Sequence, residues 1–127
     1  MNIRCYEDLI FWQKSIVLAD EIYRITGKMP WYEEKGLVSQ MQRAAVSISS
    51  NIAEGAERGN SFDYKFFLDV ARGSAAELET QIKIAEKAYK NLDFLQAKGL
   101  LTEVHKMLNK AVRTIGARIR EKRGLGF

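Results

Sequence analysis

The chain has 127 residues with 20 Lys and Arg and 16 Asp and Glu, which gives a formal net charge of +4 at pH 7. This length fits one domain with its own core.

A single cysteine, Cys5, excludes an internal disulfide framework, and a single histidine, His105, leaves too few soft ligands for a usual zinc site, so we expect no metal and no cofactor. No apolar run approaches membrane-spanning length, and the acidic Glu7, Asp8 and Asp20 do not suit a secretory signal, so we expect a cytoplasmic protein with no membrane partner.

The first predicted helix covers about residues 7–26. Its apolar residues alternate three and four positions apart, which predicts a heptad-type seam formed by Leu9, Trp12, Ile16, Ala19, Tyr23 and Thr26. Gly27 ends this helix, and Pro30 begins the next connection. Glu33 and Glu34 are then favourably placed against the positive end of a second helix.

The second predicted helix covers residues 33–57, and from 36 to 53 it carries only one charge, Arg43. Helical spacing gives it three faces. The apolar face consists of Leu37, Met41, Ala44, Ile48 and Ile52. The polar ridge beside it consists of Gln40, Arg43, Ser47, Asn51, Glu54 and Arg58. The small neutral face consists of Ser39, Val46, Ser50 and Ala53. A helix with so little charge is expected to be covered on several sides, so we assign the small neutral face to a subunit contact.

The third and fourth predicted helices cover residues 62–89 and 95–120, with Ser61 and Asp93 as their caps. The third packs through Phe67, Val70, Ser74, Leu78, Gln81, Ala85 and Ala88. The fourth packs through Leu101, Val104, Leu108, Ala111 and Ile115. Residues 121–127 are expected to form a flexible basic tail. Since no segment alternates with period two and the connections are short, we predict an all-α protein, one antiparallel up-down-up-down four-helix bundle over residues 1–127.

Polar residues in the second and third helices are expected to meet, because these helices are neighbours in such a bundle. We predict a buried polar network in which Arg43 pairs with Glu77, because a buried arginine needs a carboxylate. Its members are Gln40, Arg43, Ser47, Asn51, Glu54, Ser74, Glu77 and Gln81. Such a network can fix helix register, or Glu54 and Glu77 near Arg43 could perform acid-base chemistry.

Catalysis is not favoured by the rest of the sequence. We find no nucleophile with a recognisable base and no glycine-rich phosphate loop. A carboxylate-bridged di-metal centre would need Glu-x-x-His pairs, and His105 has no glutamate three residues before it. We therefore expect a protein that is not an enzyme.

Gly73 lies within the third predicted helix, where glycine costs about 1 kcal/mol relative to alanine. Together with Ser74, Ala75 and Ala76 it makes a smooth patch that could accept another backbone. That backbone could belong to the same bundle or to a neighbouring subunit.

Positive charge is concentrated in the last third of the chain. Residues 1–82 hold 9 Lys and Arg against 12 Asp and Glu, whereas residues 83–127 hold 11 against 4. Two stripes carry most of these cations: Lys83, Lys87 and Lys90 on the third helix, and Lys106, Lys110, Arg113 and Arg120, followed by Lys122 and Arg123, on the fourth. Each stripe could be an ordinary solvated face or could hold a phosphate backbone through salt-sensitive contacts. No aromatic interleaving accompanies them in the sequence, so we expect binding led by charge and shape.

Five segments of the chain resemble the 23S rRNA intervening-sequence protein family, also called the S23 family. They are residues 6–13 (Y-E-D-L-I-F-W-Q), 36–40 (G-L-V-S-Q), 43–47 (R-A-A-V-S), 51–55 (N-I-A-E-G) and 73–81 (G-S-A-A-E-L-E-T-Q). The resemblance implies a cytoplasmic four-helix bundle, commonly a ring-shaped homopentamer, with no known enzymatic activity. The family is similar in fold to the accessory variability proteins of retroelements, which are basic pentamers that bind a reverse transcriptase and nucleic acid.

The family signature falls on Gln40, Arg43, Ser47, Asn51, Glu54, Gly55, Arg58, Gly73, Ser74, Glu77 and Gln81. Two positions depart from the family pattern. Ser49 stands where proline is common, which should leave the second helix continuous, and Lys35 stands where an aromatic residue often precedes Gly36.

Two hypotheses for the function follow from these observations. The first is a non-catalytic homo-oligomer, expected to be a pentamer, that serves as an RNA- or ribonucleoprotein-associated scaffold. The second is an adaptor ring that recruits a protein partner such as a reverse transcriptase.

Overall fold

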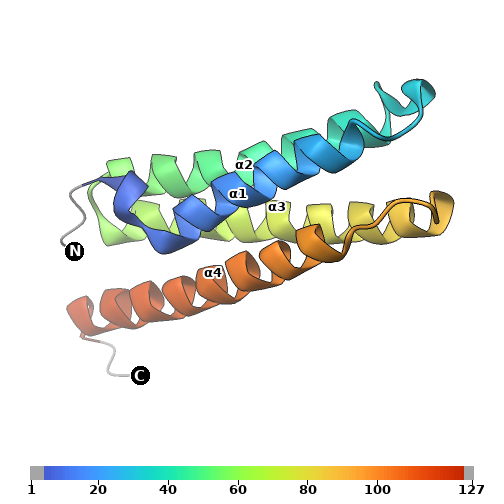
Figure 1. The fold of residues 1–127 in the computed structure, drawn as a ribbon. Helices are drawn as coiled ribbons and strands as arrows, with labels where there is room; N and C mark the ends of the chain where they lie inside the picture. Colours follow the sequence, from blue (N-terminus) through green and yellow to red (C-terminus); the bar gives the residue numbers. More distant parts are fainter. Residues whose placement is uncertain (1–4, 125–127) are drawn as a thin grey trace.

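The computed structural model describes residues 5–124 and contains four α-helices (Figure 1). They are α1 (Ile10–Thr26), α2 (Leu37–Glu57), α3 (Ser61–Ala88) and α4 (Leu95–Lys122), with short 3-10 helices η1 (Tyr6–Asp8) and η2 (Trp31–Glu33). The described residues form no strand, so the predicted all-α four-helix fold is confirmed. None of these helices combines the length and apolar character needed to cross a membrane. The predicted tail, residues 121–127, starts too early, because α4 continues to Lys122. Residues 125–127 of this predicted tail lie outside the described part of the chain.

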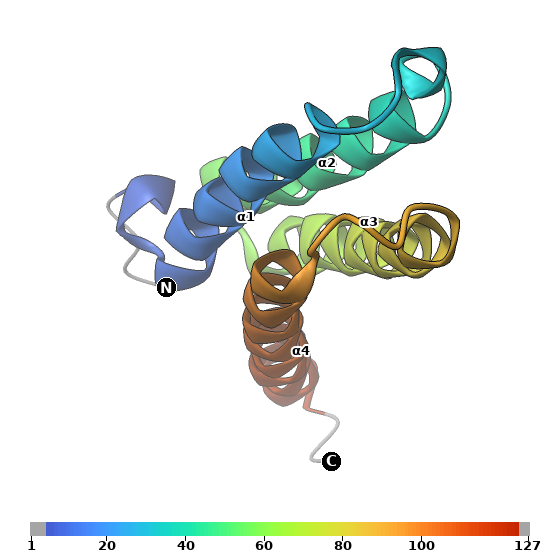
Figure 2. The ribbon, with the colours of Figure 1, turned by 45° about the vertical axis from the view of Figure 1, so that its right-hand side comes forward.

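The helices run alternately up and down, and each packs on its two neighbours around the bundle. The most extensive contact lies between α2 and α3. Figure 2 shows that the bundle is splayed, with α4 inclined to α1 and α2. The start of α3 and the end of α4 therefore share one end of the molecule, and η2 and the α3–α4 connection share the other (Figure 1).

Of the four α-helices, only α3 begins with a side-chain cap. Asn60, rather than the predicted Ser61, caps α3, since its Oδ1 accepts a hydrogen bond of 2.8 Å from the Asp63 backbone N–H. The N-cap of α4 is Phe94 rather than the predicted Asp93. The Asp93 carboxylate, one residue earlier, accepts a hydrogen bond of 2.9 Å from the Leu95 backbone N–H.

The predicted seam of α1 is only partly correct. Thr26 is buried and Leu9, Trp12 and Ala19 pack against the core, whereas Ile16 and Tyr23 are exposed. The other buried residues of α1 are Ser15, Leu18, Glu21, Ile22 and Ile25. The pattern misled because polar side chains occupy core positions and satisfy their hydrogen bonds locally. Ser15 donates to the Trp12 carbonyl at 2.6 Å and shares a bond of 2.8 Å with Ser49 on α2.

Ser49 also explains the continuity of α2. It is 7% exposed and bonds across to α1, and α2 runs without interruption from Leu37 to Glu57. The expectation that serine at this position preserves the helix is therefore confirmed. A proline there would remove both a backbone N–H and this interhelical bond.

The predicted apolar faces of the other helices are largely correct. Buried residues of α2 include Met41, Ala44, Ile48 and Ile52, and those of α4 include Leu101, Val104, Leu108 and Ile115. In α3 the buried set is Tyr64, Leu68, Ala71, Ser74, Ala75, Leu78, Gln81, Ile82 and Ala85, whereas the predicted Val70 and Ala88 are exposed. The buried set of α3 is wide because this helix packs on both α2 and α4.

Gly55 marks the closest approach of α2 to α3. A Cβ at this position would lie 2.9 Å from the Phe67 Cβ and 3.0 Å from the Tyr64 ring. Gly73, by contrast, is exposed and a Cβ there would meet nothing within 4 Å. Gly73 therefore does not admit a neighbouring helix of the same bundle, and only its alternative role in a subunit contact stays a prediction.

Hydrogen bonds near η2 connect the end of α3 to the beginning of α2. Tyr89, just after α3, donates a hydrogen bond to Glu33, and Glu33 also accepts from the Leu37 backbone N–H at 3.3 Å. The bond to Glu33 raises the pKa of the Tyr89 phenol above its ordinary value. Glu33 thus lies at the N-terminus of α2, where a negative charge is favourable, as predicted from the sequence.

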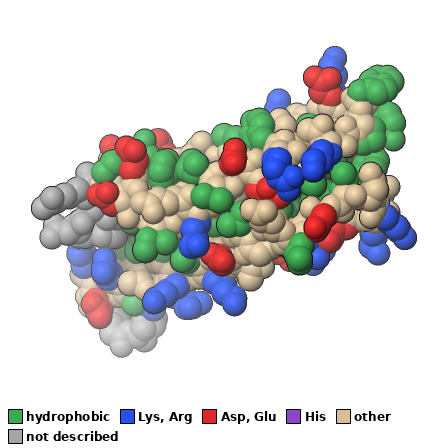
Figure 3. Space-filling view, viewed as in Figure 1, with side chains coloured by type: hydrophobic (Ala, Val, Ile, Leu, Met, Phe, Trp, Pro, Cys, Tyr) green, Lys and Arg blue, Asp and Glu red, His purple; other side chains and the backbone are tan. Residues whose placement is uncertain are grey.

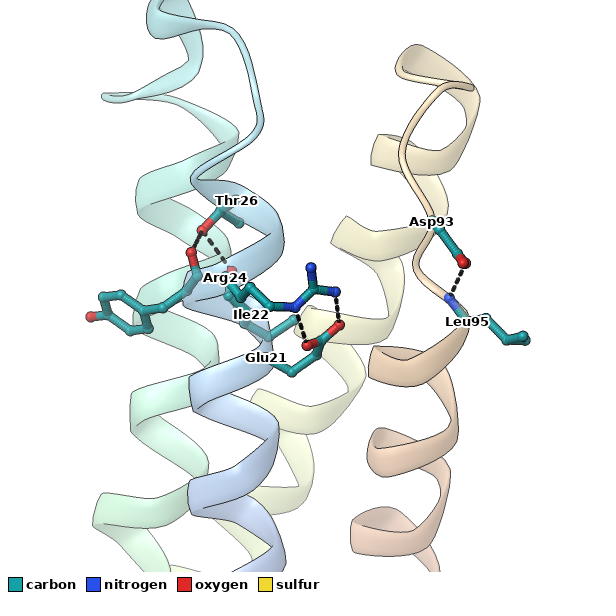
Figure 4. A network of polar contacts seen from close by, with 7 residues as sticks. Glu21, Ile22, Arg24, Thr26, Asp93 and Leu95 are labelled. Carbon is teal, nitrogen blue, oxygen red and sulfur yellow. Dashed lines mark hydrogen bonds and ion pairs between the residues drawn. The ribbon is translucent and has the colours of Figure 1, made fainter.

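Glu21 is a buried carboxylate on α1, only 4% exposed (Figure 4). Arg24 donates two hydrogen bonds of 2.7 Å to it from the same helix, and these raise the pKa of Arg24. A fork of this kind supplies the partner that a buried carboxylate requires. The sequence pattern did not predict a buried Glu21, because this residue is not part of the predicted apolar seam of the first helix.

The close contact at Gly55 leads to a test of stability. Gly55→Ala should lower the free energy of unfolding by about 1–3 kcal/mol, because the added methyl group forces α2 and α3 apart. Gly73→Ala is the matched control, since it adds the same group to an exposed helical site and should raise stability by up to about 1 kcal/mol. Urea denaturation followed by circular dichroism measures both, and equal effects of the two substitutions would contradict the packing argument.

Candidate functional site

A groove of about 390 Å³ runs between α2 and α3 on the outside of the bundle. It is lined by Gln40, Arg43, Ala44, Ser47, Ser74, Glu77 and Gln81. Six of these seven are members of the predicted polar network, so the structure brings most of that set together. It does so at an open surface.

Hydrogen bonds join only part of the predicted network. Ser47 and Ser74 share a bond of 2.7 Å between α2 and α3. Asn51 donates to the Ser47 carbonyl at 2.8 Å and to its hydroxyl at 3.1 Å. Gln81 is 9% exposed, and its Oε1 has no hydrogen-bond partner among the described residues.

The prediction of a buried Arg43–Glu77 pair is wrong for the single chain. Both residues are exposed, and no ion pair joins them within 4 Å in the described structure. Gln40 and Glu54 are exposed as well. The physical reason is that small side chains pack at the centre of the α2–α3 contact, so the longer polar ones lie along its rim in water.

The structure does not bring together all three residues considered for acid-base chemistry, Arg43, Glu54 and Glu77. Arg43 and Glu77 line the groove, but Glu54 does not, and it accepts a bond of 2.8 Å from Arg58 one turn along α2. Residues 5–124 contain no cluster of three or more His, Cys, Asp or Glu able to hold a metal ion.

A second groove, of about 710 Å³, lies on the other side of Arg43 along α2. Two members of the predicted small neutral face, Ser39 and Val46, line it beside Tyr23 of α1. Val46 is 43% exposed and Tyr23 is 50% exposed. Further along α2, Ser50 is exposed and Ala53 is half-buried. The four residues assigned to the subunit contact therefore follow one outward side of α2, where apolar surface is left uncovered.

The basic face of α4 carries little compensating charge. Residues 106–123 hold seven Lys and Arg and one Glu. Lys106, Lys110, Arg113 and Lys122 are exposed, and none of them forms an ion pair within 4 Å in the described part of the chain. Figure 3 shows Lys and Arg side chains gathered over α4 along the lower edge of the molecule. Arg118 belongs to the same exposed set, although the sequence analysis did not single it out.

The stripe on α3 is different, because acidic residues lie among its cations. Lys83 pairs with Glu79 at 3.3 Å, and Glu86 nearby pairs with Lys98 of α4 at 3.0 Å. Lys87 and Lys90 are exposed. This stripe has the mixed charge of an ordinary solvated helix face, so the uncompensated charge of the molecule is concentrated on α4.

Two groups of exposed aromatic residues were not predicted from the sequence. Trp31 and Tyr32 protrude from η2, with exposed fractions of 85% and 63%. Phe62 and Phe66 lie on the first two turns of α3, with exposed fractions of 60% and 58%. Neither group belongs to the apolar periodicity of its segment. The absence of that periodicity is the one signal in the sequence that could have identified these residues as exposed.

The fold and these surfaces define a small antiparallel four-helix bundle with a low-charge outward side on α2 and a basic outward side on α4. The sequence profile of the 23S rRNA-intervening sequence proteins matches residues 7–110. The chain belongs to this family, as the segments quoted above predicted. The comparison with curated proteins gave no match.

The fold has a counterpart among solved structures. A protein of unknown function from the S23 ribosomal protein family of Bacteroides thetaiotaomicron is similar with a TM-score of 0.69. The two chains are 21% identical, and the match covers 81% of this chain and 98% of the other. At this identity the likeness is evidence for the fold alone.

The low-charge side of α2 leads to a test of assembly. Val46→Glu and Ala53→Lys should each give monomers of about 14.5 kDa in light scattering, because a contact that covers this side would have to bury an unpaired charge. Ile84→Glu is the matched control, since Ile84 is a 54% exposed apolar residue of α3. Assembly that persists in both α2 variants would show that another face carries the contact.

Proposed function

We propose that this protein is a non-catalytic, cytoplasmic homo-oligomer, with five subunits as the expected number, that acts as an RNA- or ribonucleoprotein-associated scaffold. The observation that carries the proposal is the uncompensated basic face of α4, where seven cations accompany one carboxylate over residues 106–123. Positive charge arranged along a helix is the electrostatic footprint of proteins that bind a phosphate backbone.

Self-association would strengthen such binding. A ring repeats the α4 face once per subunit, and linked weak sites gain affinity through effective concentration. The uncovered Val46 supports a subunit contact along α2. One outward side of the bundle would thus serve assembly, and another would serve RNA.

Filter binding of a structured RNA across a salt series tests the proposal. The wild-type affinity should fall steeply as salt increases, and the double variant Lys110→Gln/Arg113→Gln should reduce the slope of log affinity against log salt by roughly 2, because each lost duplex phosphate contact contributes about 0.9. Lys87→Gln/Lys90→Gln removes the same charge from the end of α3 and the turn that follows it, and should change the slope less. Weak binding that does not respond to salt would refute the proposal.

A second candidate function is an adaptor ring that recruits a protein partner such as a reverse transcriptase. The exposed Trp31 and Tyr32 on η2 favour it, because aromatic residues are enriched in protein interfaces. They lie at the end of the bundle opposite the end of α4 (Figure 1).

Affinity capture from the native host separates the two candidates. The adaptor function predicts a reproducible protein partner that remains bound after nuclease treatment and is lost with Trp31→Ala/Tyr32→Ala. The scaffold function predicts that the captured material is RNA and that nuclease removes any accompanying protein.

A further inference from the structure

A groove of about 340 Å³ lies between the first turns of α3 and the last turns of α4. It is lined by Phe62, Lys65, Phe66, Asp69, Gly116, Ile119, Arg120 and Arg123. Its volume is within the range of sites that hold small ligands or single groups of larger ones. In the sequence its two halves are about fifty residues apart, and the antiparallel packing of α3 on α4 brings them together (Figure 1).

The α3 side of the groove presents aromatic rings to solvent. Phe62 and Phe66 are one helical turn apart, so they lie on the same side of α3. Each is more than half exposed, at 60% and 58%. Exposed rings in this arrangement can stack on flat ligands, and every nucleobase has a π face.

The α4 side of the groove supplies cations. The Arg123 guanidinium lies over the Phe62 ring of α3, 5.4 Å from its centroid. Gly116 forms part of the floor, because a Cβ there would lie 3.5 Å from the Arg120 Nη1 and 3.7 Å from the Lys65 Cε. The side chains of two cations, one from each helix, therefore lie close to the Gly116 backbone.

The groove keeps a net positive charge. Asp69 is its only carboxylate among the lining residues, and it accepts a bond of 2.9 Å from Lys65 and one of 3.2 Å from Arg72. Lys65 is therefore compensated by Asp69, and Arg123 of α4 supplies a further positive charge beside the Phe62 ring. A ligand that suits the site has a flat ring to stack and an anionic group to meet Arg123.

We propose that this aromatic and cationic groove binds single-stranded nucleic acid, with a base stacked on Phe62 and Phe66 and the adjoining phosphate at Arg123. The inference rests on the proposed RNA-associated function and specifies its ligand as an unpaired strand. A duplex keeps its bases stacked inside, so it cannot use the rings, whereas an unpaired base can. The groove therefore adds a preference for single strands to the general charge attraction of α4.

The experiment measures fluorescence anisotropy of the full-length protein with a labelled twelve-nucleotide oligouridylate and with a twelve-base-pair RNA duplex. Phe62→Ala/Phe66→Ala should weaken single-strand binding about tenfold and duplex binding less than twofold, because stacking is lost and charge is kept. Arg123→Gln should weaken single-strand binding and lower its salt slope by about 0.7, the contribution of one phosphate contact. Trp31→Ala and Lys28→Gln are matched controls, since they remove an exposed ring and an exposed cation at the other end of the bundle and should leave both affinities unchanged.

Three outcomes would overturn the inference. If Phe62→Ala/Phe66→Ala binds the oligouridylate as the wild type does, the groove is not the site, and the scaffold proposal still stands on its salt series. If this variant changes the oligomer mass in light scattering, the groove is a contact between copies of the chain. If the wild type binds neither RNA in a salt-sensitive manner, the groove and the scaffold proposal fail together.

Discussion

The close packing of α2 on α3 is the constraint on which the rest of the structure depends. Gly55 has no room for even a methyl group, since a Cβ would lie 2.9 Å from the Phe67 Cβ. Ala44, Ala71 and Ala75 of these two helices are buried in the core, beside larger residues such as Ile48 and Leu78. Because the two backbones come close, larger polar residues cannot enter between them, and they line an outer groove instead.

The outward surfaces of the bundle differ in the ligands they suit. The low-charge side of α2 leaves Val46 and its neighbours uncovered, which favours contact with another protein surface. The outer side of α4 keeps its positive charge because it offers few carboxylates, whereas the cations at the end of α3 are mixed with Glu79 and Glu86. Assembly through α2 and nucleic-acid binding through α4 would therefore use different helices and need not compete.

Sequence patterns predicted the elements well and the environment of polar residues poorly. The apolar stripes of α2 and α4 were found because leucine, isoleucine and methionine repeat at helical spacing. The seam of α1 was found only in part, because Ser15 and Glu21 are buried and each has a hydrogen-bond partner that no periodicity reveals. The Arg43–Glu77 pair failed for the opposite reason, since residues expected inside the bundle lie on its rim.

The sequence by itself determined the four helices, their order, the family and the basic character of the last third, because these depend on local spacing and composition. Only the tertiary structure decided that Gly55, and not Gly73, admits a neighbouring helix. It alone joined Phe62 and Phe66 of α3 to Arg123 of α4 in one groove. Contacts of this kind depend on how antiparallel helices of particular length and tilt align, and that geometry is a property of the packed chain.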